Sequence, residues 1–357
     1  MRKVRDSVVR GKEVYVGIED AKRSWKVCVR SEGTIVNQTS MAAEYAGLRQ
    51  YLQRRFPECR RTLMYEAGFS GFDLHDRLVS DGMECVVTPP HTVSEEKCNK
   101  QKNDRTDCRR LAKNLENGDY RECFVPDKEL REDRQISRCY GQVQSDIVRL
   151  KNRIRRTLEW HALDRHFEQG RWPDGRYAQV LPTLEAKKVS EPLLVSFRHM
   201  MSLLDAARRT RKELLRDLSK LRKKERYAHQ CSLLMTTPGV GPLTAIRLAL
   251  EWGDLSRFRR KEQFSSFLGL IPGDHSSGEK ERKGHITKQG NRAVRKWLVE
   301  SAWVAIRKDP ALLEKYQRVA GATGSKKKAI VAAARKLAIR MRTVLLTGTE
   351  YQLGIIE

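Results

Sequence analysis

The sequence predicts a mixed α/β region followed by two helical ones, and three observations favour this fold class. Short runs of apolar and β-branched residues alternate with helical stretches over the first third of the chain. Two long segments in the middle carry apolar residues at heptad spacing, and a glycine-rich turn opens a helical last third. A length of 357 residues favours two or three domains. We expect an α/β domain at 12–126, a helical coiled-coil arm or linker at 127–228 and a helical domain at 229–347.

The first third is expected to form a mixed sheet. Its first three strands alternate in polarity and are joined by short turns, one of them at Glu32-Gly33, so they should form an antiparallel meander. The following segments alternate helix and strand until Pro89-Pro90 ends the pattern. The expected strands are 13–19, 24–30, 34–37, 61–66 and 84–88, with helices at 42–55 and 71–80.

Acidic residues end two of these strands and open a later helix. Glu19 and Asp20 close the first strand, and Glu66 closes the fourth. Asp104 and Asp107 are three residues apart, so on a helix both carboxylates project from one face. Open α/β sheets place their sites at such strand ends, and clustered carboxylates need cations, for which hard oxygen ligands favour Mg²⁺. Two such ions could assist a phosphoryl transfer; the alternative is a helix cap, an arginine ion pair and strand ends that face water.

The composition favours a polyanionic partner. The chain has 71 Lys and Arg against 45 Asp and Glu, a formal net charge of +26. These charges are spread along the whole sequence, which favours nucleic acid over an anionic membrane. No apolar run reaches the length of a membrane span and the first residues lack the apolar core of a signal peptide, so we expect a cytoplasmic protein. The eight cysteines form no C-x-x-C pair, which argues against a zinc knuckle or a disulfide framework.

Two heptad seams predict a pair of long helices in the middle of the chain. The first seam contains Ile136, Tyr140, Val143, Ile147, Leu150 and Ile154, and the second contains Phe197, Met200, Leu204, Ala207, Leu214, Leu218 and Leu221, interrupted by Arg211. We expect an antiparallel arm that packs on itself or on another protomer. Its basic flanks would face phosphates or would only keep a coiled coil in solution; they are Arg149, Lys151, Arg153, Arg155, Arg156, Arg208, Arg209, Arg211 and Lys212. The segment 166–182 between the seams is expected to be a loop.

The last third contains two glycine-bounded segments of chemical interest. Gly239 and Gly241 lie in a turn that opens a helix at 243–251, where backbone N–H groups could hold a phosphate as in a helix-hairpin-helix, although any turn between helices needs glycine. Ser276 and Ser277 lie in a loop with Lys280, Arg282 and Lys283, so a hydroxyl could attack a phosphodiester, or the loop is a flexible turn. A final Ala-rich basic helix at 329–346, with Arg335, Lys336, Arg340 and Arg342, is either a nucleic-acid contact or a packed cap.

Three N-terminal motifs carry a family resemblance. VGIEDAK at 16–22, YEAG at 65–68 and KNDRTD at 102–107 are similar to the motifs of the DEDD transposases of bacterial insertion sequences, the insertion-sequence-one-ten family, which is related to the pilin-gene invertases. The resemblance implies a ribonuclease-H-like domain of the Holliday-junction-resolvase type. Its acidic positions fall on Glu66, Asp104 and Asp107. The first one falls on Glu19, where the family usually has Asp, and Asp20 follows directly, so either residue is a candidate.

The last third resembles the C-terminal transposase domain of the same family. The motifs are PGVGP at 238–242, Arg257-Phe258, LGLIP at 268–272, SSG at 276–278 and GHITKQGN at 284–291, so similar regions extend from about 14 to 303. The resemblance implies a covalent serine nucleophile at Ser277, with Ser276 as the fallback. It also implies a dimer or tetramer in which the two sites come from different subunits. A structured guide RNA of the bridge type would pair with target and donor DNA.

We therefore expect an insertion-sequence transposase, an RNA-guided DNA recombinase that cuts and rejoins strands through a 5′-phosphoserine intermediate, assisted by Mg²⁺ on Glu19 or Asp20, Glu66, Asp104 and Asp107. The expected nucleic-acid contacts are Gly239, Gly241, Lys102, Arg105, Lys280, Arg282, Lys283, Lys288 and Arg292. Two alternatives remain. One is a metal-only DNA endonuclease or junction resolvase, and the other is a non-catalytic nucleic-acid-binding scaffold, for which the charge alone would suffice.

Overall fold

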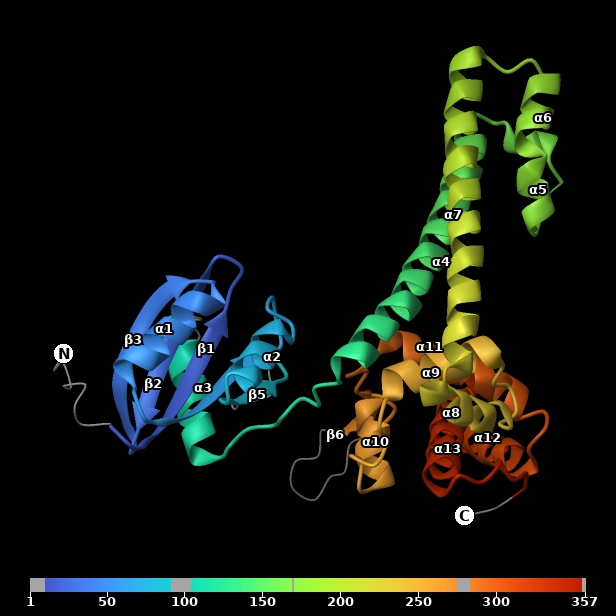
Figure 1. The fold of residues 1–357 in the computed structure, drawn as a ribbon. Helices are drawn as coiled ribbons and strands as arrows, with labels where there is room; N and C mark the ends of the chain where they lie inside the picture. The colour runs from blue at the N-terminus through green and yellow to red at the C-terminus, as the bar shows by residue number, and fades with distance from the viewer. Residues whose placement is uncertain (1–9, 91–103, 169, 275–282, 355–357) are drawn as a thin grey trace. The chain divides into compact units, whose positions relative to one another are not determined.

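The computed structural model describes residues 10–90, 104–168, 170–274 and 283–354, and the chain forms two compact units, Met1–Pro126 and Asp127–Glu357 (Figure 1). Within the described ranges, the side chains of Asp104, Arg105, Asp274 and Lys283 are left out. None of the helices in these ranges combines the length and the hydropathy of a membrane span.

The first unit is built on a five-stranded sheet in the order β3-β2-β1-β4-β5. The strands β1 (Glu13–Asp20), β2 (Ser24–Ser31) and β3 (Thr34–Ala42) form the expected antiparallel meander, and β4 (Arg60–Glu66) and β5 (Glu84–Thr88) continue the sheet in parallel with β1. The third strand is longer than the expected 34–37, because the polar residues that follow pair with β2 as an edge strand and need no apolar face. The predicted mixed sheet is confirmed.

Helices cover both faces of this sheet. The helices α1 (Tyr45–Arg55) and α2 (Asp73–Ser80) contribute Leu48, Leu52, Leu74 and Leu78 to a core with the inward residues of the strands. The opposite face carries α3 (Asp104–Asn117), which approaches β1 so closely that a Cβ on Gly17 would lie 2.2 Å from the Cys108 carbonyl oxygen. Only glycine permits this contact, so the VGIE motif of β1 has a packing role that fixes α3 against the sheet.

The second unit begins with a long helical hairpin (Figure 1). Its two helices, α4 (Lys128–Trp160) and α7 (Glu191–Lys223), pack along the predicted seams, with Ile147, Ile154 and Leu204 buried between them. Arg211, which interrupts the second seam, donates from Nη1 to Gln144 Oε1 of α4 at 3.4 Å. The polar pair therefore replaces one apolar layer without breaking the contact.

The segment 166–182 is not the loop that its Gly and Pro content suggested. The segment begins at the last residue of a 3-10 helix (Asp164–His166). It also contains α5 (Asp174–Ala178) and the start of α6 (Val180–Ala186). Phe167, Trp172 and Tyr177 pack ring against ring, with centroids 5.2 and 5.3 Å apart, and join the core of the hairpin. Three aromatic side chains bury enough apolar surface to order a segment with few aliphatic residues.

The rest of the second unit is a helical bundle with one small hairpin of strands. Its elements are α8 (Glu225–Met235), α9 (Pro242–Trp252), α10 (Lys261–Phe267), β6 (Pro272–Asp274), β7 (Lys283–Ile286), α11 (Arg292–Ala305), α12 (Pro310–Thr323) and α13 (Lys326–Thr347). The helix expected at 243–251 is α9. In α13, Arg340 is buried and its Nη1 donates to Asp309 Oδ2, while Arg342 donates to the Phe258 carbonyl. These two arginines therefore pack within the bundle, as the cap alternative required.

Candidate active site

Glu19 and Glu66 end neighbouring parallel strands. Ile18 of β1 lies opposite Tyr65 of β4, so Glu19 and Glu66 are the next residues at the same end of the two strands. Side chains alternate between the faces of a strand. Ile18 and Tyr65 belong to the core on the α1 and α2 side, which places Glu19 and Glu66 on the opposite face, the one covered by α3.

Asp107 of α3 reaches the same place. One guanidinium nitrogen, Nη2 of Arg110, lies 3.3 Å from Asp107 Oδ1 and 3.6 Å from Glu66 Oε1. The three side chains are between 23% and 28% exposed, so the cluster is partly buried and still reached by solvent. The structure thus brings together two carboxylates that are far apart in the sequence. Asp104 is the first residue of α3, but its side chain lies outside the described atoms.

Glu19 also acts on this part of α3. The pKa of the Cys108 thiol is raised, chiefly by burial, and the negative charge of Glu19 raises it further. Cys108 follows Asp107 directly on α3, so Glu19 lies within electrostatic range of the turn that carries Asp107. Strand alternation thus places Glu19 on the face covered by α3, near the turn of that helix that carries Asp107.

Asp20 faces the other way and is engaged in hydrogen bonds. Its Oδ1 accepts from Trp25 Nε1 at 2.9 Å and from Ser70 Oγ at 2.7 Å, and its Oδ2 accepts from the Ser70 amide at 2.6 Å. These bonds tie the segment after Glu66 to the end of β1. From the sequence, either Glu19 or Asp20 could be the first acidic ligand. In the structure the two side chains lie on opposite faces of β1: Glu19 is on the face covered by α3, while Asp20 anchors the segment that follows β4.

The donor chemistry of this cluster fits a divalent cation. Carboxylate oxygens are the hard ligands that Mg²⁺ prefers. Among the described residues, no three His, Cys, Asp or Glu side chains are already arranged as a metal site. Instead the Arg110 guanidinium supplies positive charge between Glu66 and Asp107, and its Nε is buried without a hydrogen-bond partner in the described part of the chain. Arg110, three residues after Asp107 on the helix, makes the arginine ion pair that the sequence offered as the alternative to a metal site.

The serine loop is carried by the β6–β7 hairpin. Pro272 pairs with Ile286 and Asp274 with Lys283, so the strands enclose the segment that holds Ser276 and Ser277. Residues 275–282, with both serines, Lys280 and Arg282, lie outside the described residues, and Lys283 is described by its backbone alone.

The base of this hairpin is closely packed. A Cβ on Gly269 would lie 2.0 Å from the Gln289 carbonyl oxygen, and one on Gly290 would lie 2.2 Å from the Phe267 carbonyl oxygen. Both glycines have positive φ, at +65° and +104°. Arg295, missed in the sequence, donates to the carbonyl of Gly290 at 3.0 Å. The LGLIP and GHITKQGN motifs therefore fold against each other and fix the two ends of the serine loop.

The remaining candidate nucleic-acid contacts differ in how closely they are packed and how exposed they are. Gly239 has a packing reason to be glycine, because a Cβ there would lie 2.4 Å from the Ser301 carbonyl oxygen of α11. Gly241 is open, with nothing within 4 Å of its Cβ position. Lys288 is exposed at φ +56°, and Arg292 is exposed at the start of α11. Lys102 and the side chain of Arg105 lie outside the described atoms.

Comparison with known proteins adds two matched domains. The DEDD transposase model of the IS110 group matches residues 16–162, and the model described as the transposase IS116/IS110/IS902 family matches residues 231–317. A provisionally named transposase of Sinorhizobium fredii is 28% identical over 302 residues, covering 82% of this chain and 72% of the relative. The transposase for insertion sequence element IS1111A of Coxiella burnetii is 29% identical over 225 residues, 62% of this chain and 59% of the relative. The pilin gene-inverting protein of Moraxella bovis is 32% identical over 111 residues, 30% of this chain and 34% of the relative.

Proposed function

We propose that this DNA transposase, which matches two domain models of the IS110 insertion-sequence family, cuts and rejoins DNA with two half-sites. One half-site is the carboxylate cluster of Glu19, Glu66, Asp104 and Asp107. The other is the hydroxyl of Ser277, with Ser276 as the fallback. The observation that carries the proposal is the meeting of Glu66 and Asp107 at one Arg110 nitrogen, beside the face to which Glu19 points.

The proposed cleavage is an exchange of one phosphate ester for another. Ser277 Oγ attacks the phosphorus of a DNA phosphodiester and the bond to the 3′ oxygen breaks, leaving a 5′-phosphoserine and a free 3′ hydroxyl. The serine proton goes to a nearby base and the 3′ oxygen takes up a proton. Rejoining is the reverse step with the 3′ hydroxyl of another strand, which releases Ser277. Because an ester bond is conserved throughout, the strands can be rejoined without an external energy source.

The acidic cluster would act on the phosphate through a bound cation. Glu19, Glu66, Asp104 and Asp107 would hold Mg²⁺, which supplies positive charge against the developing negative charge of the transferring phosphate. We assign the first ligand position to Glu19, because Asp20 already accepts three hydrogen bonds from Trp25 and Ser70 on the other face. Asp20 would position Glu66 by holding the residues that follow it.

The family resemblance further suggests that Ser277 and the carboxylates of one site come from different subunits of a dimer or tetramer. It also suggests a structured bridge-type RNA as the guide for target and donor DNA, with the reaction taking place in the cytoplasm. In such a complex base pairing selects the sequence, and the protein needs to read only backbone and shape, which agrees with a net charge of +26.

The test is to trap the covalent intermediate on a nicked or suicide DNA substrate. The protein should form an adduct that survives denaturation, and Ser277→Ala should abolish both the adduct and plasmid excision. Ser276→Ala is the matched control and should keep both. A metal-only nuclease or resolvase would instead cut without an adduct and would tolerate Ser277→Ala, and a non-catalytic scaffold would tolerate Asp104→Ala as well.

A further inference from the structure

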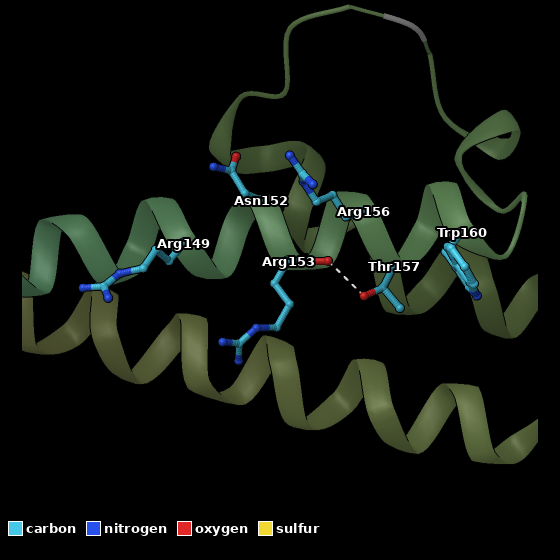
Figure 2. A pocket seen from close by; sticks show the side chains of 6 residues that line it. All are labelled: Arg149, Asn152, Arg153, Arg156, Thr157 and Trp160. Carbon is cyan, nitrogen blue, oxygen red and sulfur yellow. Dashed lines mark hydrogen bonds between the residues drawn. The ribbon is translucent and has the colours of Figure 1, made fainter.

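One face of α4 is lined by basic and polar side chains that the carboxylate cluster and the serine hairpin do not use. Arg149, Asn152, Arg153, Arg156, Thr157 and Trp160 surround a shallow depression of about 510 Å³ (Figure 2). They recur at intervals of three and four residues, which places them on one side of the helix. Figure 2 shows all six side chains rising from this single stretch of α4. We call this surface the α4 basic face.

The positive charge of the α4 basic face is largely uncompensated. Arg149 pairs with the exposed Asp146 at 2.8 Å, whereas no carboxylate of the described residues pairs with Arg153 or Arg156. Their neighbours on the other side of the helix are engaged within the fold. Lys151 pairs with Asp174 and lies over the Tyr177 ring, and Arg155 pairs with Glu159 at 3.9 Å and lies over Trp172. On one side of α4, the basic side chains are therefore paired with carboxylates of the fold. On the other side, Arg153 and Arg156 have no carboxylate partner among the described residues.

Trp160 adds an exposed aromatic ring at the end of the α4 basic face. Its side chain is 85% exposed, the largest exposed fraction among the large hydrophobic residues that the structure describes. The nearby rings of Phe167, Trp172 and Tyr177 pack on one another, and Trp160 takes no part in that cluster. An indole left in water gains free energy from any flat apolar partner, and arginines that flank it select a partner with negative charge.

We propose that the α4 basic face binds a single-stranded segment of nucleic acid, with Arg149, Arg153 and Arg156 at its phosphates and Trp160 stacked on an unpaired base. A stack of this kind needs a base that has left its duplex neighbours, which favours a single strand over a duplex. An identical face of a second copy is disfavoured, because it would bring arginines against arginines. Unpaired RNA and unpaired DNA share this chemistry, and the experiment below separates them.

The experiment measures binding of labelled oligonucleotides by fluorescence anisotropy with the full chain. The probes are oligo(dT), oligo(U) and a DNA duplex of equal length, each titrated over a range of salt concentrations. Trp160→Ala should weaken binding of at least one single-stranded probe about tenfold, the loss of about one base stack, and should leave the salt dependence unchanged. Arg153→Gln and Arg156→Gln should each reduce the slope of log Kobs against log salt by about 0.7. Arg155→Gln, on the neutralised side of the same helix, is the matched control and should change the affinity much less.

The probe that loses affinity in Trp160→Ala identifies the ligand as RNA, as DNA or as both. Equal affinity of wild type and Trp160→Ala for both single strands would overturn the proposal, and so would a change of oligomeric state in Trp160→Ala, which would mean that a second copy covers the ring. The inference takes from the proposed function only that the protein works on nucleic acid. Because no strand is cut in the assay, a failure here is distinct from a failure of the Ser277 chemistry.

Discussion

The carboxylate cluster and the serine hairpin are built in different ways. Glu19 and Glu66 are fixed by the register of two adjacent parallel strands, and Asp107 by a helix that Gly17 lets approach the sheet. The described residues on either side of the serine loop are held by the backbone contacts of Gly269 and Gly290. The comparison shows in which region the residues needed for activity differ from those needed for stability. In the cluster, a carboxylate can be replaced without disturbing the sheet and helix that hold it. At the hairpin base, a change that disturbs the backbone packing should lower both stability and activity.

The largest effect is expected from removing a carboxylate of the cluster. Asp107→Asn should lower strand cleavage on the order of a thousandfold, the loss typical of removing one group that stabilises transition-state charge. Stability should change little, because the ion pair that Asp107 makes with Arg110 among the described residues is partly exposed to solvent. Cleavage rates, calorimetric titration with Mg²⁺ and thermal unfolding measure the three quantities. Asp119→Asn, an exposed carboxylate of the same unit, is the control, and equal cleavage by both variants would remove Asp107 from the site.

The second largest effect is expected at the hairpin base, where a substitution should lower stability as well as activity. Gly290→Ala places a Cβ 2.2 Å from the Phe267 carbonyl oxygen at a φ of +104°, so it should cost roughly 2–4 kcal/mol of unfolding free energy. Activity should fall together with stability in denaturant unfolding and cleavage assays. Gly241→Ala, in open space at φ −89°, is the matched control for stability and should leave the free energy of unfolding nearly unchanged. A fully stable Gly290→Ala would mean that the hairpin base is looser than this packing indicates.

Glu19 and Asp20 sharpen the comparison within the cluster itself. Glu19→Gln should lose cleavage and Mg²⁺ binding, because its carboxylate would ligate the metal on the α3 side in the proposed site. Asp20→Asn should instead cost about 1–2 kcal/mol, since an amide replaces a charged acceptor of the Ser70 and Trp25 hydrogen bonds. It should reduce cleavage only partly. The reversed pattern, with Asp20→Asn inactive and stable, would exchange the two roles.

The smallest effect is expected at Arg110. Arg110→Gln removes the positive charge between Glu66 and Asp107, so the metal-free protein should lose about 0.5–1 kcal/mol through carboxylate repulsion. The same repulsion should strengthen Mg²⁺ binding, so the Tm increase caused by Mg²⁺ over EDTA should be larger than in wild type. Arg109→Gln is the control, because it removes the neighbouring positive charge, whose guanidinium donates from Nε to Gln38 Oε1 at 2.6 Å. An unchanged Mg²⁺-dependent Tm in Arg110→Gln would show that Arg110 does not compete with the cation.

The sequence predicted the parts of the fold that depend on local pattern. The five strands and the long helices of the arm follow from alternation and heptad spacing, which act between near neighbours in the chain. It failed where order comes from distant contacts. The segment 166–182 contains α5 and the start of α6, and its aromatic residues join the core of the hairpin of α4 and α7. At position 239, a Cβ would clash with a backbone carbonyl of α11, so glycine is needed there.

By itself, the sequence determined which residues could hold a cation and which hydroxyls could attack a phosphate, because those properties belong to the side chains. Only the tertiary structure decided which carboxylates meet. The alternation of β1 already sends Glu19 and Asp20 to opposite faces, but the face that matters is the one covered by α3, and that is set by Gly17 and by packing across about 90 residues of chain. The same holds for α4, where helical spacing groups the basic side chains. Contacts with Trp172 and α5 engage Lys151 and Arg155, whereas Arg153 and Arg156 have no carboxylate partner among the described residues.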